Sequence, residues 1–190
     1  MNGDAIMGRP HPTVDVPGHH PALLSELLAC AVDPEGHAAE LARGVAGVSA
    51  DVPAGHVCAT AWILDPAGDH VVVVFHETLG WSSPGGHVMP GEATCDAARR
   101  EVAEETGLTE PTLTSVLPGP LTVHVTDGAE PGHRHWNVAY LFTAPVDAPL
   151  VGEMGRAVRW VAVSELHRLD RRPDDLVAVT PWAREVLLAT

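Results

Sequence analysis

Runs of apolar and β-branched residues recur along the chain from residue 56, and they predict a domain with several strands. Residues 56–64 (HVCATAWIL) and 70–77 (HVVVVFHE) are apolar and β-branched, and a turn rich in Asp, Pro and Gly separates them. That arrangement is typical of two paired strands. Further strand-like runs lie at residues 112–117, 121–126, 135–144 and 157–163.

Apolar residues at helical spacing interrupt these runs. Residues 96–106 (DAARREVAEET) contain no helix breaker, and Thr94 is placed to cap that helix and Gly107 to end it. Two more helices are predicted at residues 164–169 and 180–189, the second with Pro181 in its first turn. The order of strands and helices predicts an α/β or α+β domain whose strands form one mixed sheet.

The first 54 residues differ in composition from the rest. Residues 1–20 are rich in Gly, Pro and His without periodicity and predict a flexible N-terminal arm. Apolar residues recur at helical spacing in residues 21–32 and 35–47, which predicts a helical hairpin within residues 21–54. The predicted organisation is an arm, an N-terminal helical segment and one domain over residues 55–190.

The acidic balance of the chain narrows the range of partners. The formal net charge is −14 at pH 7, and the 11 residues counted as Lys or Arg are all arginine. Contacts to the phosphates of a nucleic-acid polymer need clustered Lys and Arg, so the composition argues against such a partner. Any cation that neutralises a bound phosphate must be Arg, His or a metal ion.

The three cysteines, Cys30, Cys58 and Cys95, are widely spaced and form neither a zinc-binding pair nor a disulfide framework. Reduced thiols predict a cytoplasmic protein. No run reaches the ~18–20 apolar residues of a membrane span, and no basic segment followed by an apolar run marks a secretory signal. We therefore expect no membrane partner.

Acidic residues are concentrated in the predicted helix 96–106. Glu101, Glu104 and Glu105 are spaced i, i+3 and i+4, so they share one helical face and can converge on one point. Like charges at one point repel unless a cation neutralises them, and Mg²⁺ or Mn²⁺ takes oxygen ligands of this kind. A solvated acidic face is the alternative interpretation of the same spacing.

The flanks of the helix favour the metal site. The segment from Ser82 to Gly86 allows a close approach of the backbone, with carbonyl groups free to point at a metal ion. Glu92 opens the helical region, where the helix dipole favours its charge, and Arg100 can fix the carboxylate of Glu101. The opposite face carries residues that can pack on the sheet: Cys95, Ala98 and Val102.

These residues resemble the signature of the Nudix hydrolase superfamily. That signature reads G-x5-E-x7-R-E-U-x-E-E-x-G-U, where U is a bulky apolar residue, and every specified position from Gly86 to Leu108 matches. Trp81 also resembles the family's usual approach to this motif, and Glu153 resembles a later acidic residue found in many members. The resemblance implies the Nudix fold, a mixed sheet sandwiched between helices.

The resemblance also implies a reaction, in which Mg²⁺ or Mn²⁺ and water cleave a diphosphate linked to another moiety X. It implies that Glu104 and Glu105 are metal ligands, together with the carbonyl group of Gly85. Glu101 would be either a further ligand or the general base.

The same resemblance implies supporting roles for three more residues. Arg100 would orient a glutamate. Glu92 would support the segment before the helix or join the metal shell, and Glu153 would supply an extra acidic ligand or base from a separate loop.

Polar residues on a later strand are candidates for substrate binding. His133, His135 and Asn137 alternate and so would project from one face of a strand, although a half-exposed polar strand is the alternative. The His-x-His pair also suggests a transition-metal site, for which the sequence shows no third ligand. His76 and His87 lie beside the predicted loop and are candidates to contact phosphate, with a structural role as the alternative.

The combined prediction is a Mg²⁺-dependent hydrolase of a small phosphorylated metabolite, with a nucleoside diphosphate derivative as the leading substrate class. The alternative substrate is a non-nucleotide diphosphate, such as an isoprenyl or alkyl diphosphate. The alternative function is a nucleotide-sensing Nudix module without catalysis. The predicted N-terminal helices would either cover the pocket or form the contact of a homodimer.

Overall fold

The computed structural model describes residues 55–89, 92–114, 119–126 and 133–190. The predicted arm and the helical segment before residue 55 lie outside the described residues. Those two assignments, and the domain boundary that they set, stay predictions.

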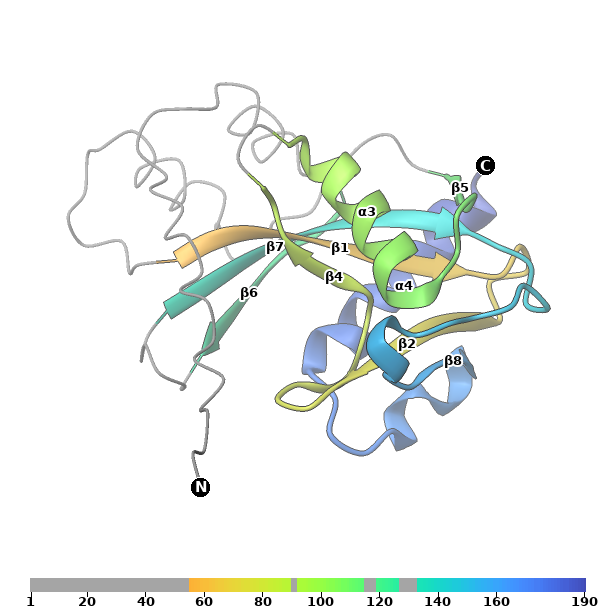
Figure 1. Ribbon diagram of the computed structural model, residues 1–190. Coiled ribbons are helices and arrows are strands. Elements are labelled where there is room, and N and C mark those ends of the chain that lie inside the picture. Colours follow the sequence, from red (N-terminus) through yellow and green to blue (C-terminus); the bar gives the residue numbers. More distant parts are fainter. Residues whose placement is uncertain (1–54, 90–91, 115–118, 127–132) are drawn as a thin grey trace.

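The described strands form one mixed sheet, drawn in Figure 1. They are β1 (Gly55–Leu64), β2 (His70–His76), β3 (Gly80–Ser82), β4 (Gly85–His87), β5 (Thr112–Leu113), β6 (Leu121–Thr126), β7 (His133–Thr143) and β8 (Val158–Ala162). The path of paired strands is β3-β2-β1-β7-β5, while β4 pairs with β1, β6 with β7 and β8 with β2. The central strands β1 and β7 are parallel, and the other described pairs are antiparallel.

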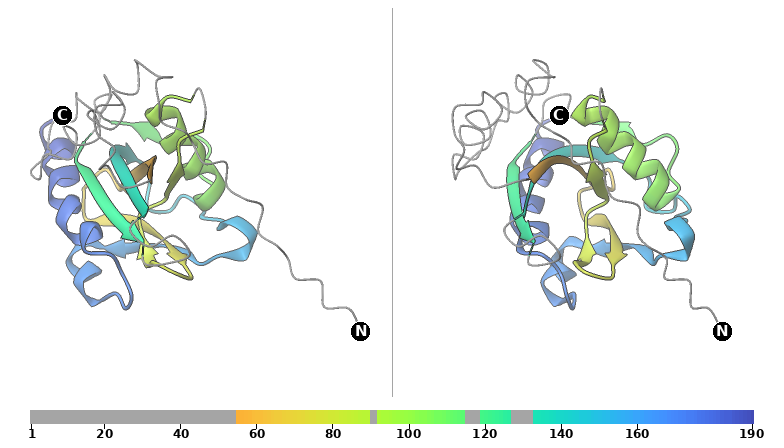
Figure 2. Two further views of the ribbon diagram at one scale, coloured as in Figure 1. Left: turned by 90° about the vertical axis from the view of Figure 1, so that its left-hand side faces the viewer. Right: turned by 60° about the vertical axis from the view of Figure 1, so that its left-hand side comes forward.

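Helices cover both faces of this sheet, as predicted. The described helices are α3 (Thr94–Thr106), α4 (Asp174–Leu188) and the 3-10 helices η1 (Glu153–Gly155) and η2 (Val163–Arg168). Figure 2 shows α3 and α4 on opposite sides of the sheet. Alternate residues of β1 follow this division, since Ala61 and Ile63 join the core beneath α3, whereas Trp62 and Leu64 join the core beneath α4.

Strand β4 replaces part of the loop that the sequence predicts before α3. Gly85 and Gly86 lie opposite Thr60 and Ala59 of β1 in an antiparallel register. A Cβ atom on Gly85 would lie 2.7 Å from the carbonyl oxygen of Ala59, so only glycine fits this approach without a shift of the backbone. The glycine pair thus forms a short edge of sheet against which α3 packs.

The predicted end of α3 is confirmed and its predicted cap is wrong. Gly107 has a left-handed φ of 73°, and its N–H donates to the carbonyl of Ala103 at 3.1 Å. Thr94 is the first helical residue, and the residue at the cap position is Ala93, which makes no side-chain cap bond. The hydroxyl of Thr94 is buried and lies 2.5 Å from that of Tyr140, so it faces the sheet instead of the helix end.

The C-terminal helix is longer than predicted. It begins at Asp174, because Asp174 and Asp175 place negative charge in the first turn, where the helix dipole favours it. Pro181 therefore lies inside α4 rather than in its first turn. The hydroxyl of Thr180, next to this proline, donates to the carbonyl of Leu176 at 2.5 Å. Among the described residues, no helix combines the length and the apolar content that a membrane crossing requires.

Two smaller elements differ in form from their predictions. The strand expected at residues 112–117 is described only as the two-residue β5, because residues 115–118 lie outside the described part of the chain. The helix expected at residues 164–169 is the 3-10 helix η2.

Candidate active site

Two carboxylates of α3 lie against β4 and are shielded from solvent. Glu105 is 6% exposed, and its Oε2 accepts a hydrogen bond from the N–H of Gly85 at 3.0 Å. Glu101 is 9% exposed, and a Cβ atom on Gly86 would lie 2.4 Å from its Oε1. The two glycines therefore allow two acidic side chains to reach the strand.

Arg100 connects the remaining acidic residues to this pair. Its Nε and Nη2 donate to Glu92 at 2.9 and 3.0 Å, and its Nη1 donates to Glu101 and, at 3.2 Å, to Glu104. Nη2 also donates to the carbonyl of His87 at 2.9 Å. The sequence predicts that Arg100 fixes one carboxylate, whereas the structure places three around it.

The acids around Arg100 differ in position and exposure. The side chain of Glu104 is 51% exposed and projects into solvent from the last turn of α3. Glu92 lies two residues before the first helical residue, Thr94, so it precedes the helix instead of opening it. Its Oε2 accepts the N–H of Met89 at 2.9 Å, which ties it to the segment before the helix.

Burial changes the ionisation of these acids. It is the largest cause that raises the pKa of Glu105 to about 7, against the hydrogen bond from Gly85. Burial also raises the pKa of Glu101, although the bond from Arg100 opposes that shift. The pKa of Glu92 is lowered, chiefly by its hydrogen bond with Arg100. A further cation near Glu101 and Glu105 would therefore stabilise their charged forms.

A second cationic residue approaches Glu105 from η1. The Nη1 of Arg156 lies 3.7 Å from Oε1 of Glu105 and 3.2 Å from Oε2 of Glu153, so it connects the predicted later acid to the site. His76 at the end of β2 adds its Nε2 at 3.3 Å from Oε1 of Glu105. Burial, and then the charge of Arg156, lowers the pKa of His76, so this contact is made by a neutral imidazole at pH 7.

The sequence pointed to His76 only through its position beside the predicted loop, and it gave no signal for Arg156. A cavity of about 580 Å³ adjoins both residues. It is lined by Phe75, His76, Glu77, Thr78, Met154, Gly155, Arg156 and Ala157. Space for a ligand thus lies beside the partners of Glu105.

The backbone of Gly85 points toward the acids. Ala61 donates its N–H to the carbonyl of Pro84 at 2.8 Å, and Gly85 is paired with Thr60. Because bonded and non-bonded positions alternate along an antiparallel ladder, the N–H and C=O of Gly85 point away from β1. The N–H meets Glu105, and the C=O is directed to the same side of the strand.

These groups fit a divalent cation of the Mg²⁺ or Mn²⁺ type. The carboxylates of Glu101, Glu104 and Glu105 and the carbonyl of Gly85 are all oxygen donors, which such ions prefer. Burial is the largest cause that raises the pKa of Glu101 and of Glu105, and a bound cation would favour the charged form of both carboxylates. The donor chemistry and the raised pKa values therefore agree with the predicted metal site.

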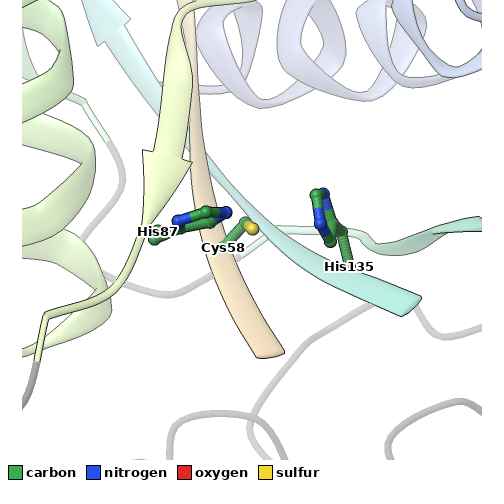
Figure 3. Close-up of side chains that lie close together, drawn as sticks. All are labelled: Cys58, His87 and His135. Atoms are coloured by element: carbon green, nitrogen blue, oxygen red, sulfur yellow. The ribbon is translucent and has the colours of Figure 1, made fainter. Parts of the chain in front are cut away.

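Of the three substrate-binding residues predicted on β7, the structure describes the side chains of His135 and Asn137. The side chain of His133 lies outside the description, and Asn137 is 7% exposed. His135 lies next to His87 of β4 and Cys58 of β1, as Figure 3 shows. The sequence shows no third metal ligand for the His-x-His pair, and the structure supplies candidates from two other strands. Trp136 points to the other face, as predicted, and is buried in the core beneath α3.

The described residues thus form a mixed sheet between helices, with glutamates of α3 against the Gly-Gly strand β4. Residues 54–183 match the family model of the NUDIX domain, which is more than half of the chain. The chain therefore belongs to the NUDIX family, and it is a pyrophosphohydrolase of the Nudix type. Members of this family act on small molecules and generally depend on a divalent metal ion.

Solved structures of other proteins share the fold. A NUDIX-family hydrolase from Clostridium perfringens is 22% identical, with a TM-score of 0.54 over 70% of this chain and 97% of that chain. An Ap4A hydrolase from C. elegans is 17% identical, with a TM-score of 0.59 over 71% and 99%. The dihydroneopterin triphosphate pyrophosphohydrolase of E. coli is 16% identical, with a TM-score of 0.52 over 66% and 92%. Among curated proteins, no sequence matches the chain.

Proposed function

We propose that this Nudix hydrolase cleaves a phosphoanhydride bond in a nucleoside diphosphate derivative, with the bond placed between α3 and β4. The observation that carries the proposal is the arrangement of three glutamates of α3. Arg100 donates to Glu101 and Glu104, and the N–H of Gly85 donates to Glu105. Carboxylate oxygens along one face of a helix are suited to a cation that in turn binds a diphosphate. The outward C=O of Gly85 supports the same assignment.

Glu104, Glu105 and the carbonyl of Gly85 would hold the metal ion, and Glu101 would be a further ligand or the group that accepts a proton from water. When bound, the metal ion would neutralise the diphosphate and lower the pKa of a coordinated water. Arg100 keeps the carboxylates in place through its fixed set of donors. Glu153 is a second candidate for the proton acceptor, since Arg156 connects it to Glu105.

The cavity beside Glu105 would receive part of the substrate. Arg156 and His76 lie on its wall, so a phosphate there would meet a guanidinium group and an imidazole group. In a chain without lysine, this is a chemically suitable place for the negative end of the substrate. His87 of β4 and the polar residues of β7, on the two strands paired with β1, would contact the moiety X.

A substrate panel tests the proposal directly. Hydrolysis is measured with Mg²⁺ for nucleoside triphosphates, nucleotide sugars, dinucleotides and prenyl diphosphates. The readout is released phosphate or pyrophosphate for the triphosphates and prenyl diphosphates, and the nucleoside phosphate formed for the nucleotide sugars and dinucleotides. We expect turnover of a nucleotide derivative. Turnover of prenyl diphosphates alone would favour the non-nucleotide substrate class. Tight binding of a nucleotide without turnover would overturn the proposal and favour a sensor.

Substitution of the metal ligands tests the site. Glu104→Gln or Glu105→Gln should lower kcat at least ~100-fold, because a lost ligand weakens the stabilisation of charge in the transition state. Glu185→Gln, at an exposed position of α4, is the matched control and should keep full activity. Thermal unfolding of each variant shows whether the fold is intact. Full activity of both site variants would refute the metal assignment.

A further inference from the structure

Three side chains outside the carboxylate site bring one sulfur atom and two ring nitrogens together. Cys58, His87 and His135 each offer one ligand atom, and these atoms all lie within 4.8 Å of one another. Cys58 is 4% exposed, and the two histidines are partly buried. The imidazole rings meet edge to face, with centroids 5.5 Å apart and planes at 86° (Figure 3).

Pairing of the strands, and not a local sequence motif, assembles this group. Cys58 of β1 lies opposite His87 in the antiparallel register with β4. It also lies opposite Asn137 in the parallel register with β7, two residues from His135. Residues two apart on a strand point to the same face, so the three side chains share one face of the sheet. Their positions are therefore fixed by backbone hydrogen bonds.

We propose that Cys58, His87 and His135 bind a transition-metal ion of the Zn²⁺ type, at a site separate from the oxygen ligands of the glutamates. Thiolate and imidazole are characteristic ligands of Zn²⁺, whereas Mg²⁺ prefers oxygen. Three protein ligands leave one tetrahedral position for water or for a donor atom of a bound substrate. One sheet would then carry two metal sites of different chemical preference.

The three ligand atoms would have to move only a short distance to bind one ion. Zn–S bonds of about 2.3 Å and Zn–N bonds of about 2.0–2.1 Å in a tetrahedron place neighbouring ligand atoms about 3.3–3.6 Å apart. The three atoms, all within 4.8 Å, would need to approach by about 1 Å, which rotation of the side chains can supply. The imidazole rings of His87 and His135 already lie together, with one ring nitrogen of each close to the sulfur of Cys58.

The alternative is that Cys58 is an ordinary buried thiol packed beside two imidazole rings. Burial raises the pKa of the Cys58 thiol, so without a metal ion the sulfur keeps its proton at neutral pH. A coordinated thiol loses that proton, and metal binding would therefore release it. The two interpretations thus differ in a measurable way, because only the metal site forms a thiolate.

One residue connects this site to the carboxylate site. The side chain of His87 faces Cys58 and His135, while its carbonyl accepts a hydrogen bond from Arg100 at 2.9 Å. The ligand atoms of the two sites are nevertheless different, so variants can remove one set and leave the other. The proposal can therefore be tested whether or not the hydrolase assignment holds.

Titration of the full, reduced chain with Co²⁺ in the presence of Mg²⁺ tests the site. Bound Co²⁺ in a Cys-His-His environment should give a thiolate-to-cobalt charge-transfer band and visible absorption, saturating at one ion per chain, and Zn²⁺ should abolish both. Cys58→Ser should eliminate the charge-transfer band. Cys30→Ser and Cys95→Ser remove the other two thiols and are the matched controls, which should keep it.

Two further variants keep the result interpretable. His135→Gln should weaken Co²⁺ binding at least ~10-fold even if Cys58→Ser fails to fold, since it removes a ligand from a partly buried position. Glu104→Gln should leave the band unchanged, because its carboxylate belongs to the other site. No thiolate band in the parent protein would overturn the proposal. A band that survives Cys58→Ser or disappears in Cys95→Ser would also overturn it.

Discussion

Arg100 illustrates how one side chain organises the acidic site. A guanidinium group has five N–H donors in one plane, and those of Arg100 reach the carboxylates of Glu92, Glu101 and Glu104 and the carbonyl of His87. An ammonium group is a single point charge and cannot reproduce this set of directions. The arginine therefore fixes the positions of the acids as well as offsetting part of their charge.

Arg100→Lys should separate these two effects, since it keeps the charge and removes the fork of donors. We expect a loss of about 1–3 kcal/mol in the free energy of unfolding, because several bonds to carboxylates are lost at a position that is 25% exposed. The value of kcat should also fall, because the acids are no longer held. Denaturant unfolding and steady-state kinetics measure both changes. Arg99→Lys, at an exposed position, is the control and should change neither.

The raised pKa of Glu105 predicts that the stability of the metal-free protein depends on pH. Its pKa is about 7 in the folded chain against an ordinary value of 4.5. The folded state therefore keeps a proton that the unfolded state loses, so the contribution of Glu105 is complete below pH 4.5 and is lost as pH rises to about 7. Glu105→Gln cannot ionise and lacks this decline.

The free energy of unfolding is measured by denaturant titration, with a chelator present to remove metal ions, between pH 4.5 and pH 7. The stability of the parent relative to Glu105→Gln should decrease with rising pH, and saturating Mg²⁺ should reverse the trend because it favours the carboxylate. A difference that is constant across the range would contradict the raised pKa.

At the scale of elements, the site depends on how closely α3 approaches β4. The strand has no side-chain atoms at Gly85 and Gly86, which brings its backbone to the carboxylates of Glu105 and Glu101. A Cβ atom would contact different groups at the two glycines. At Gly85 it would meet the backbone of Ala59, and at Gly86 it would meet only the end of a glutamate.

Gly86→Ala should therefore displace Glu101 and leave the sheet intact. We expect a small change in stability and a fall in kcat of about 10-fold to 100-fold, because a misplaced catalytic group is costly. Gly68→Ala is the control, since its φ of +72° makes the substitution strain the backbone of the β1–β2 turn without a contact to the glutamates. That variant should lose stability and keep kcat. Equal losses of kcat in the two variants would contradict the assignment.

The sequence predicted those elements whose pattern is local. The apolar runs of β1 and β2, the breaker-free stretch of α3 and its end at Gly107 are all readable within a dozen residues. Strand β4 is too short for any periodicity, and its pairing with β1 depends on contacts between distant segments. Arg156 was missed for the same reason, because nothing near it in the sequence points to Glu105.

For the whole molecule, the net charge of −14 sets the response to cations. A highly acidic chain is destabilised by self-repulsion, which monovalent salt screens without any specific site. A bound divalent ion adds stability by mass action, about 2.7 kcal/mol at one hundred times its Kd. The two effects must be measured separately.

Mg²⁺ should raise the Tm of the chelator-treated protein more than NaCl does at equal ionic strength. In Glu104→Gln, the excess effect of Mg²⁺ should be reduced, whereas the effect of NaCl should stay the same. Thermal unfolding followed by circular dichroism provides the comparison. If Mg²⁺ and NaCl act equally on the parent protein, the metal ion has no specific site.

The parallel pairing of β1 with β7 has a consequence for how the chain folds. Gly55 pairs with Arg134 and Leu64 with Thr143, so the centre of the sheet joins segments that are far apart in sequence. Closing so long a loop slows folding, and during synthesis α3 is complete before β7 exists. The helix also packs on β7, so a nascent chain that ends before β7 lacks part of the core that holds α3 and its glutamates against the sheet.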